Sequence, residues 1–176
     1  MPSGYKLDSS GERSTGDSTA LDTTHQVPSG KLCSLLEGTS WIDATGIVGG
    51  SFAQNDYINA SSTAEIAQEA DAYTAADAKR AMTLLWRVFG KCAHFTDTTS
   101  GTTAAVTMTR SELNGVGDQA FEAVETSPTY MGGTTLAAIR VGDVIVTCLV
   151  SSTASDKGSG ALRYAERIAE SIKKMR

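Results

Sequence analysis

The three cysteines carry the most distinctive chemistry in this chain of 176 residues. Cys33 and Cys92 lie 59 positions apart, and a disulfide closing that loop would stabilise the fold by roughly 4 kcal/mol on the chain-entropy model. The alternative is that both are small buried thiols. Cys148 lies within the apolar run 144–150, where burial would raise its pKa and suppress the reactive thiolate, so we expect it to be a packing residue.

The sequence contains few residues that could bind a metal or exchange protons near neutral pH. The chain has two histidines, His25 and His94. Cys92 and His94 are two ligand types in close sequence, but a cysteine in a disulfide cannot bind a metal. We therefore expect no metal site and no cofactor.

No pattern of catalytic residues stands out either. The segment 158–160, Gly-Ser-Gly, lacks the Gly-x-Ser-x-Gly elbow that exposes a nucleophilic serine. The segment 132–135, Gly-Gly-Thr-Thr, lacks the Gly-Lys-Ser/Thr of a phosphate loop and is typical of a turn. Asp118 and Asp143 each follow a glycine, where a carboxylate commonly accepts backbone N–H groups. We predict no catalytic residues.

Four aromatic residues could contribute to a cleft. Trp41, Tyr73 and Tyr130 could line an apolar cleft of the kind that holds a small ligand. Trp86 is better explained as a core residue, because it neighbours Leu85 within a predicted helix. The first three are our candidate ligand-binding residues.

The elements that would position these residues begin after a polar N-terminal stretch. Residues 1–30 are rich in Ser, Thr, Gly and Asp and show no apolar period, so they cannot offset the entropy of ordering. We predict a disordered tether over residues 1–30 and one compact domain over residues 31–176.

Apolar periodicity predicts helices and strands within that domain. The helices are expected at 31–38, 74–90 and 162–175, and the strands at 51–58, 63–70, 102–110, 119–125, 134–141 and 144–151. The second strand is ambiguous, because Ala and Glu also favour helix. Thr74 and Asp77 resemble a helix-capping box, and Gly142 and Asp143 form a hairpin signal. The order predicts an α+β fold with helices packed on one face of an antiparallel sheet.

Charge and hydropathy limit the partners. The net charge of −5, from 20 acidic and 15 basic residues, disfavours nucleic acid. The chain contains no run of about 18 apolar residues and no basic, apolar leader, so we expect a soluble chain as given.

The order of several short motifs resembles the PknH-like extracellular sensor domain of actinobacterial receptor Ser/Thr kinases, which is also found in cell-envelope lipoproteins. The matching segments are 31–36 (KLCSLL), 72–80 (AYTAADAKR), 117–120 (GDQA) and 139–146 (IRVGDVIV), so the likeness covers about residues 31–176.

This resemblance implies a disulfide between Cys33 and Cys92. It also implies a second bridge ending at Cys148, but the partner position, near Met131, holds no cysteine, so Cys148 is expected to be unpaired. The resemblance further implies a sheet backed by helices, a cleft for a small ligand and no catalytic residues. It suggests that the tail is the spacer of a lipoprotein, with a lipid anchor upstream.

These observations favour an extracellular or envelope-anchored sensor that binds an unknown small-molecule or envelope ligand. One alternative is a structural or protein-interaction lipoprotein without a ligand pocket. Another is a hydrolase or thiol enzyme, which would need an activated Ser or Cys.

Overall fold

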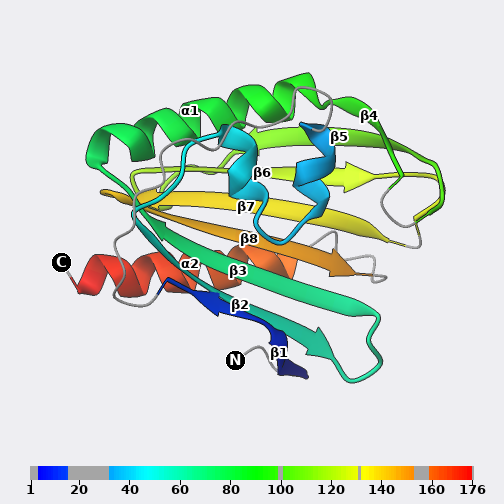
Figure 1. Cartoon of the computed structure of the whole chain (residues 1–176), viewed down its shortest axis with the longest axis horizontal. Coiled ribbons are helices and arrows are strands. Elements are labelled where there is room, and N and C mark those ends of the chain that lie inside the picture. The colour runs from blue at the N-terminus through cyan, green and yellow to red at the C-terminus, as the bar shows by residue number, and fades with distance from the viewer. Residues whose placement is uncertain (1–3, 16–31, 99–100, 131, 153–158, 176) are drawn as a thin grey trace.

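The computed structural model describes residues 4–15, 32–98, 101–130, 132–152 and 159–175, and the remaining positions, His25 among them, lie outside it. Within the described residues, eight strands form one antiparallel sheet in the order β1-β2-β3-β8-β7-β6-β5-β4 (Figure 1). The strands are β1 (Tyr5–Ser14), β2 (Ser51–Asn59), β3 (Ala64–Ala72), β4 (His94–Asp97), β5 (Ala104–Glu112), β6 (Gln119–Thr126), β7 (Gly133–Val141) and β8 (Val144–Ser152).

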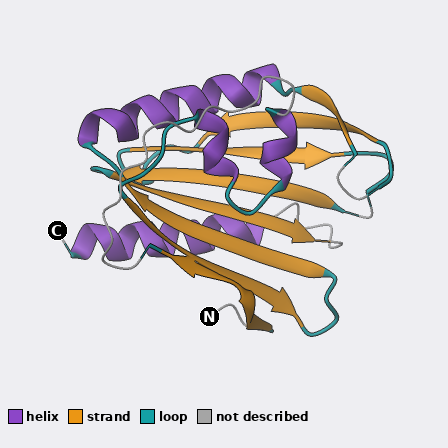
Figure 2. Cartoon of the chain, viewed as in Figure 1, coloured by secondary structure: helices purple, strands orange, loops and turns teal. Residues whose placement is uncertain are grey.

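Two α-helices cover the sheet, α1 (Ala75–Lys91) and α2 (Ser159–Lys174). The α+β class and the antiparallel sheet are confirmed, and Figure 2 shows the two helices on opposite sides of the strands. In β7, Leu136 and Ala138 pack with α1, whereas Ala137 and Ile139 pack with α2. The arrangement therefore differs from the single covered face that we expected, because these central strands are apolar on both sides.

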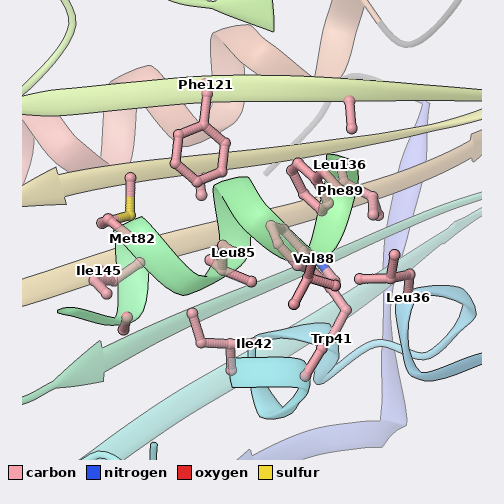
Figure 3. Close-up of a cluster of buried hydrophobic side chains, with 14 of the residues drawn as sticks. Leu36, Trp41, Ile42, Met82, Leu85, Val88, Phe89, Phe121, Leu136 and Ile145 are labelled. Atoms are coloured by element: carbon pink, nitrogen blue, oxygen red, sulfur yellow. The ribbon is translucent and has the colours of Figure 1, made fainter. Parts of the chain in front are cut away.

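The face under α1 holds an apolar core with an aromatic centre (Figure 3). The rings of Phe89 and Phe121 lie 5.6 Å apart edge to face, and Trp41 and Phe89 are also 5.6 Å apart. Met82 and Leu85 of α1 are fully buried beside them. Burying such side chains is worth about 1.5–3 kcal/mol each, so this cluster fixes α1 on the sheet.

Two 3-10 helices precede β2 and lie on the same face as α1. They are η1 (Cys33–Glu37) and η2 (Trp41–Thr45), and we call residues 33–45 the clasp segment. Its apolar side chains Leu36, Trp41 and Ile42 are buried against α1 (Figure 3). The disulfide between Cys33 and Cys92, at the end of α1, is present as the resemblance implied. The clasp segment is therefore tied covalently at its beginning and by packing along its length.

The N-terminal stretch differs from the expected tether in residues 5–14, which pair with β2 as edge strand β1. A side chain at Gly11 would overlap the carboxylate of Asp56, so glycine permits the close approach of the two strands. Residues 16–30 of the predicted tether lie outside the described residues. No helix within the described part is long and apolar enough to cross a membrane.

Candidate functional site

A pocket of about 530 Å³ lies at the N-terminal end of α1, and we call it the Tyr73 pocket. Ile47, Val48 and Tyr73 give it an apolar wall, whereas Asp77 and Arg80 of α1 bring opposite charges to it. The full lining is Thr45, Gly46, Ile47, Val48, Gly50, Ser51, Ala72, Tyr73, Thr74, Asp77 and Arg80. Such a mixture suits a small ligand with an apolar body and a polar group.

Local hydrogen bonds shape both walls of this pocket. The Thr74 hydroxyl accepts a hydrogen bond from the Asp77 N–H at 3.1 Å, which confirms the predicted start of α1. On the other wall, Gly46 has a φ of 66°, a conformation that favours glycine, and the Thr45 hydroxyl accepts from the Ile47 N–H at 3.0 Å. The loop 45–50 then rejoins the sheet through Gly50. The pocket is thus built between two ordered turns.

Behind the Tyr73 pocket lies a group of carboxyls from η2 and β3, Asp43, Glu69 and Asp71, which we call the β3 acid cluster. Glu69 is 4% and Asp71 5% exposed. Burial, and then the charge of Glu69, raise the pKa of Asp71 to about 9. Burial and these charges also raise the pKa of the Tyr73 hydroxyl, which has no hydrogen-bond partner among the described residues.

A row of polar side chains connects the β3 acid cluster to the sheet edge. Arg13, Gln54, Glu69 and Thr147 are register partners across β1, β2, β3 and β8. Arg13 Nη2 donates to Gln54 Oε1 at 2.7 Å, and the Ser40 hydroxyl donates to Glu69 Oε2 at 2.9 Å. The clasp segment therefore contacts this part of the sheet through polar groups, whereas α1 contacts the sheet through apolar side chains.

A second group of carboxyls, Glu37, Asp97 and Glu125, lies near the other end of α1, and we call it the β6 acid cluster. Glu125 is fully buried, and neither of its carboxyl oxygens has a donor among the described residues. Burial, and then the charge of Glu37, raise the pKa of Glu125 to about 9, while burial, and then the charge of Asp97, raise the pKa of Glu37 to about 7. Asp97 accepts a hydrogen bond from the Tyr130 hydroxyl at 3.0 Å.

The structure separates the three aromatic residues that we predicted to line one cleft. Tyr73 lines the Tyr73 pocket, whereas Trp41 is fully buried in the core beside Phe89. Tyr130 donates a hydrogen bond to Asp97 of the β6 acid cluster, which lies near the opposite end of α1, a helix of 17 residues, or about 25 Å. A shared role for the three in one cleft thus has no support from their positions.

Sequence reasoning missed both acid clusters. Glu37, Asp43 and Asp97 lie outside the long predicted strands, and only tertiary packing brings them to Glu125 and Asp71. A signal did exist in β3, where alternate positions face the core and the acids Glu69 and Asp71 continue the parity of buried Ala67.

The remaining chemical candidates have structural explanations. Cys148 is buried on the α2 face, and burial raises the pKa of its thiol to about 12, as expected for a packing residue. The Asp118 carboxylate accepts from the Gly142 N–H at 2.7 Å and from Arg140 at 3.2 Å, which pins the β7–β8 hairpin. Across the described ranges, no group of three or more His, Cys, Asp or Glu could hold a metal ion.

Comparison with solved structures finds a similar fold. The crystal structure of the extracellular domain of PknH from Mycobacterium tuberculosis matches with a TM-score of 0.65 over 98% of this chain and 86% of that chain. The sequences are 14% identical, so this likeness shows a shared fold. No protein-family model matches the chain, and neither does any curated protein.

Proposed function

We propose that this chain is a non-catalytic sensor domain that binds a ligand outside the cell or in the cell envelope. The observation that carries the proposal is the fold, which it shares with the extracellular domain of a kinase. The Cys33–Cys92 disulfide supports the same location, because such bonds persist in oxidising compartments.

The Tyr73 pocket is the proposed ligand site. Its volume of about 530 Å³ falls within the range of small-molecule sites, and it presents both apolar and charged side chains. Tyr73 lines this pocket while its hydroxyl is buried near the β3 acid cluster, so its ring offers the ligand an apolar packing surface. We expect a small molecule with an apolar body that packs on Ile47 and Val48.

The non-catalytic part of the proposal rests on the state of the candidate nucleophiles. Cys148 is buried with a raised pKa, and Cys33 and Cys92 are joined to each other. Burial also raises the pKa of Tyr73, which keeps its hydroxyl protonated. These groups favour binding over covalent chemistry.

A pair of matched substitutions tests the ligand site. Val48→Trp fills the Tyr73 pocket, whereas Val116→Trp places the same ring in a different pocket, beside the β5–β6 turn. A panel of small molecules extracted from bacterial envelopes is screened by thermal shift, and hits are measured by calorimetry. We expect Val48→Trp to abolish binding and Val116→Trp to retain it. The absence of any hit, or equal loss in both variants, would favour a protein-interaction module without a ligand.

The lipid anchor upstream of the tail stays a prediction. Its support is the extracellular location proposed above. Partition of the native protein into a detergent phase, followed by mass analysis of its first peptide, tests it. An unmodified peptide from the aqueous phase would contradict it.

A further inference from the structure

The clasp segment brings one carboxyl group to each acid cluster. Glu37 of η1 lies against Glu125, and Asp43 of η2 lies near Glu69 and Asp71. The two ends of one segment therefore meet buried carboxyls of the sheet at two separate places.

The β6 acid cluster cannot hold full negative charge without compensation. Among the described residues, the titratable groups that face Glu37 are Glu125 of β6, Asp97 of β4 and Tyr130 of the β6–β7 loop, all neutral or negative. Both Glu125 oxygens are buried and without a donor in the described part of the molecule. A hydrogen bond between the Glu37 and Glu125 carboxyls requires a proton on one of them, and Glu125 is the donor that its surroundings favour.

The β3 acid cluster differs in one respect: both members of its carboxyl pair, Glu69 and Asp71, belong to the sheet, and Asp43 is the carboxyl of the clasp segment that faces them. Asp71 faces Glu69 on its own strand, Asp43 of η2 and the hydroxyl of Tyr73. In the described ranges, Arg13 of β1 is the cation that acts on Glu69, and its guanidinium is bonded to Gln54, a neutral amide. Asp71 Oδ2 is buried and has no donor among the described residues, so here too a proton on Asp71 can bond to Glu69.

We propose that the clasp segment is a proton-operated latch, in which one proton joins Glu37 of the segment to Glu125 of the sheet, and a second proton on the Glu69–Asp71 pair limits the repulsion between this pair and Asp43 of the segment. Neither cluster has the arrangement of three or more His, Cys, Asp or Glu that could hold a metal ion, and no such group is found in the described part of the chain. The proton satisfies the buried oxygens with the groups already present.

The latch opens as the pH rises. In the β6 acid cluster, burial and neighbouring charges raise the pKa of Glu37 to about 7 and that of Glu125 to about 9, so the pair loses its protons in turn as the pH rises and carries two repelling charges only in the alkaline range. The stabilisation is therefore present at low pH and is lost as the pH rises through the folded-state pKa values. Because the clasp segment continues into the loop 45–50, its opening also moves one wall of the Tyr73 pocket.

Trp41 provides a direct readout of the latch. The chain has two tryptophans, and Trp86→Phe keeps an aromatic ring against Phe121 while leaving Trp41, in η2, as the only indole. We expect the emission of Trp41 in this variant to move to longer wavelength between pH 7 and 9.5, while the far-ultraviolet circular dichroism stays that of the folded sheet. The folding equilibrium constant should fall up to about tenfold per pH unit for each retained proton.

Three amide variants in the Trp86→Phe background assign the effect to the pairs. Glu37→Gln, Glu125→Gln and Asp71→Asn cannot lose a proton, and their amides donate to the remaining carboxylate, so each should move the Trp41 transition to higher pH. Glu112→Gln, at an exposed position on β5, should leave the transition unchanged. If one variant fails to fold, the others still test the latch.

Two outcomes would overturn the proposal. One is a Trp41 emission that stays constant to pH 10, or that responds identically in the amide variants and in Glu112→Gln. The other is a return of the Trp41 emission to shorter wavelength when millimolar CaCl₂ is added at pH 8.5, provided that Glu125→Gln abolishes this return. That result would mean that the cluster binds a cation rather than a proton. Neither measurement involves a ligand in the Tyr73 pocket, so failure of the latch leaves the proposed function to its own test.

Discussion

Helix α1 and the clasp segment pack on the same face of the sheet, but different interactions hold them there. Under α1, Phe89, Phe121 and Leu85 pack in a dry cluster. Under the clasp segment, a row of hydrogen-bonded polar groups crosses β1, β2 and β3. The segment also contacts the buried carboxyls of the β3 and β6 acid clusters. Apolar burial is insensitive to pH, whereas buried acids couple stability to protons. One part is therefore a fixed scaffold and the other is adjustable.

The largest expected effect comes from removing the bond that joins the two parts. The double variant Cys33→Ala/Cys92→Ala should lower the free energy of unfolding by about 4 kcal/mol, because the unfolded chain gains the entropy of an open loop. Urea unfolding at fixed pH measures the change. Cys148→Ala is the control for loss of a buried thiol alone, and an equal effect of that variant would contradict this explanation.

A cavity in the apolar cluster under α1 should lower the free energy of unfolding by nearly as much, and this loss should not depend on pH. Leu85→Ala removes a fully buried side chain from α1, and we expect a loss of about 3 kcal/mol. The loss should be the same at pH 5.5 and pH 6.5, both below the proposed opening of the latch, because the substitution removes apolar contacts alone. A cost that changed strongly between the two pH values would mean that the two parts are not independent.

A smaller effect is expected where the clasp segment meets the polar row. Ser40→Ala removes the hydrogen bond to Glu69 and should cost about 1 kcal/mol. The bond favours ionised Glu69, whose pKa is raised chiefly by burial, so the cost should be larger at pH 7 than at pH 5, both below the proposed opening of the latch. Thermal unfolding at both pH values measures it, and Ser111→Ala, which loses an exposed bond to Glu122, is the control. A cost that is larger at pH 5 would reverse the assignment.

The smallest predicted change concerns the rim of the Tyr73 pocket. Thr74→Ala removes the cap of α1 and should cost about 1 kcal/mol or less, whereas Thr74→Ser should be nearly neutral because it keeps the hydroxyl. Chemical denaturation compares the two variants. If both lose the same amount, the methyl group rather than the hydrogen bond stabilises this end of the helix.

The helices and strands of the scaffold could be predicted from the sequence because local signals agree with tertiary packing there. The spacing of Ala78, Met82, Leu85 and Phe89 identified α1, and Gly142 identified the β7–β8 hairpin, where its φ is 65°. Strand β4 was missed because it has only four residues and its pairing with β5 is not local.

The candidate site was less predictable than the fold. The structure places Tyr73 at a pocket, whereas the positions of Trp41 and Tyr130 depend on how η2 and the β6–β7 loop pack. The continuous apolar runs in β7 and β8 did indicate that both faces of these strands are covered. In the structure α1 covers one face and α2 covers the other. Among the buried acids, the strand parity of β3 pointed only to Glu69 and Asp71, because Glu and Asp look the same in sequence whether exposed or enclosed.

The Cys33–Cys92 bond fixes the first residue of the clasp segment to the end of α1. When a segment is fixed at one end and rotates about that point, the displacement increases along it and is largest at the other end. That far end is Thr45, at the mouth of the Tyr73 pocket. The covalent bond would thus convert a small displacement near Glu37 into a larger one at the place where a ligand would enter.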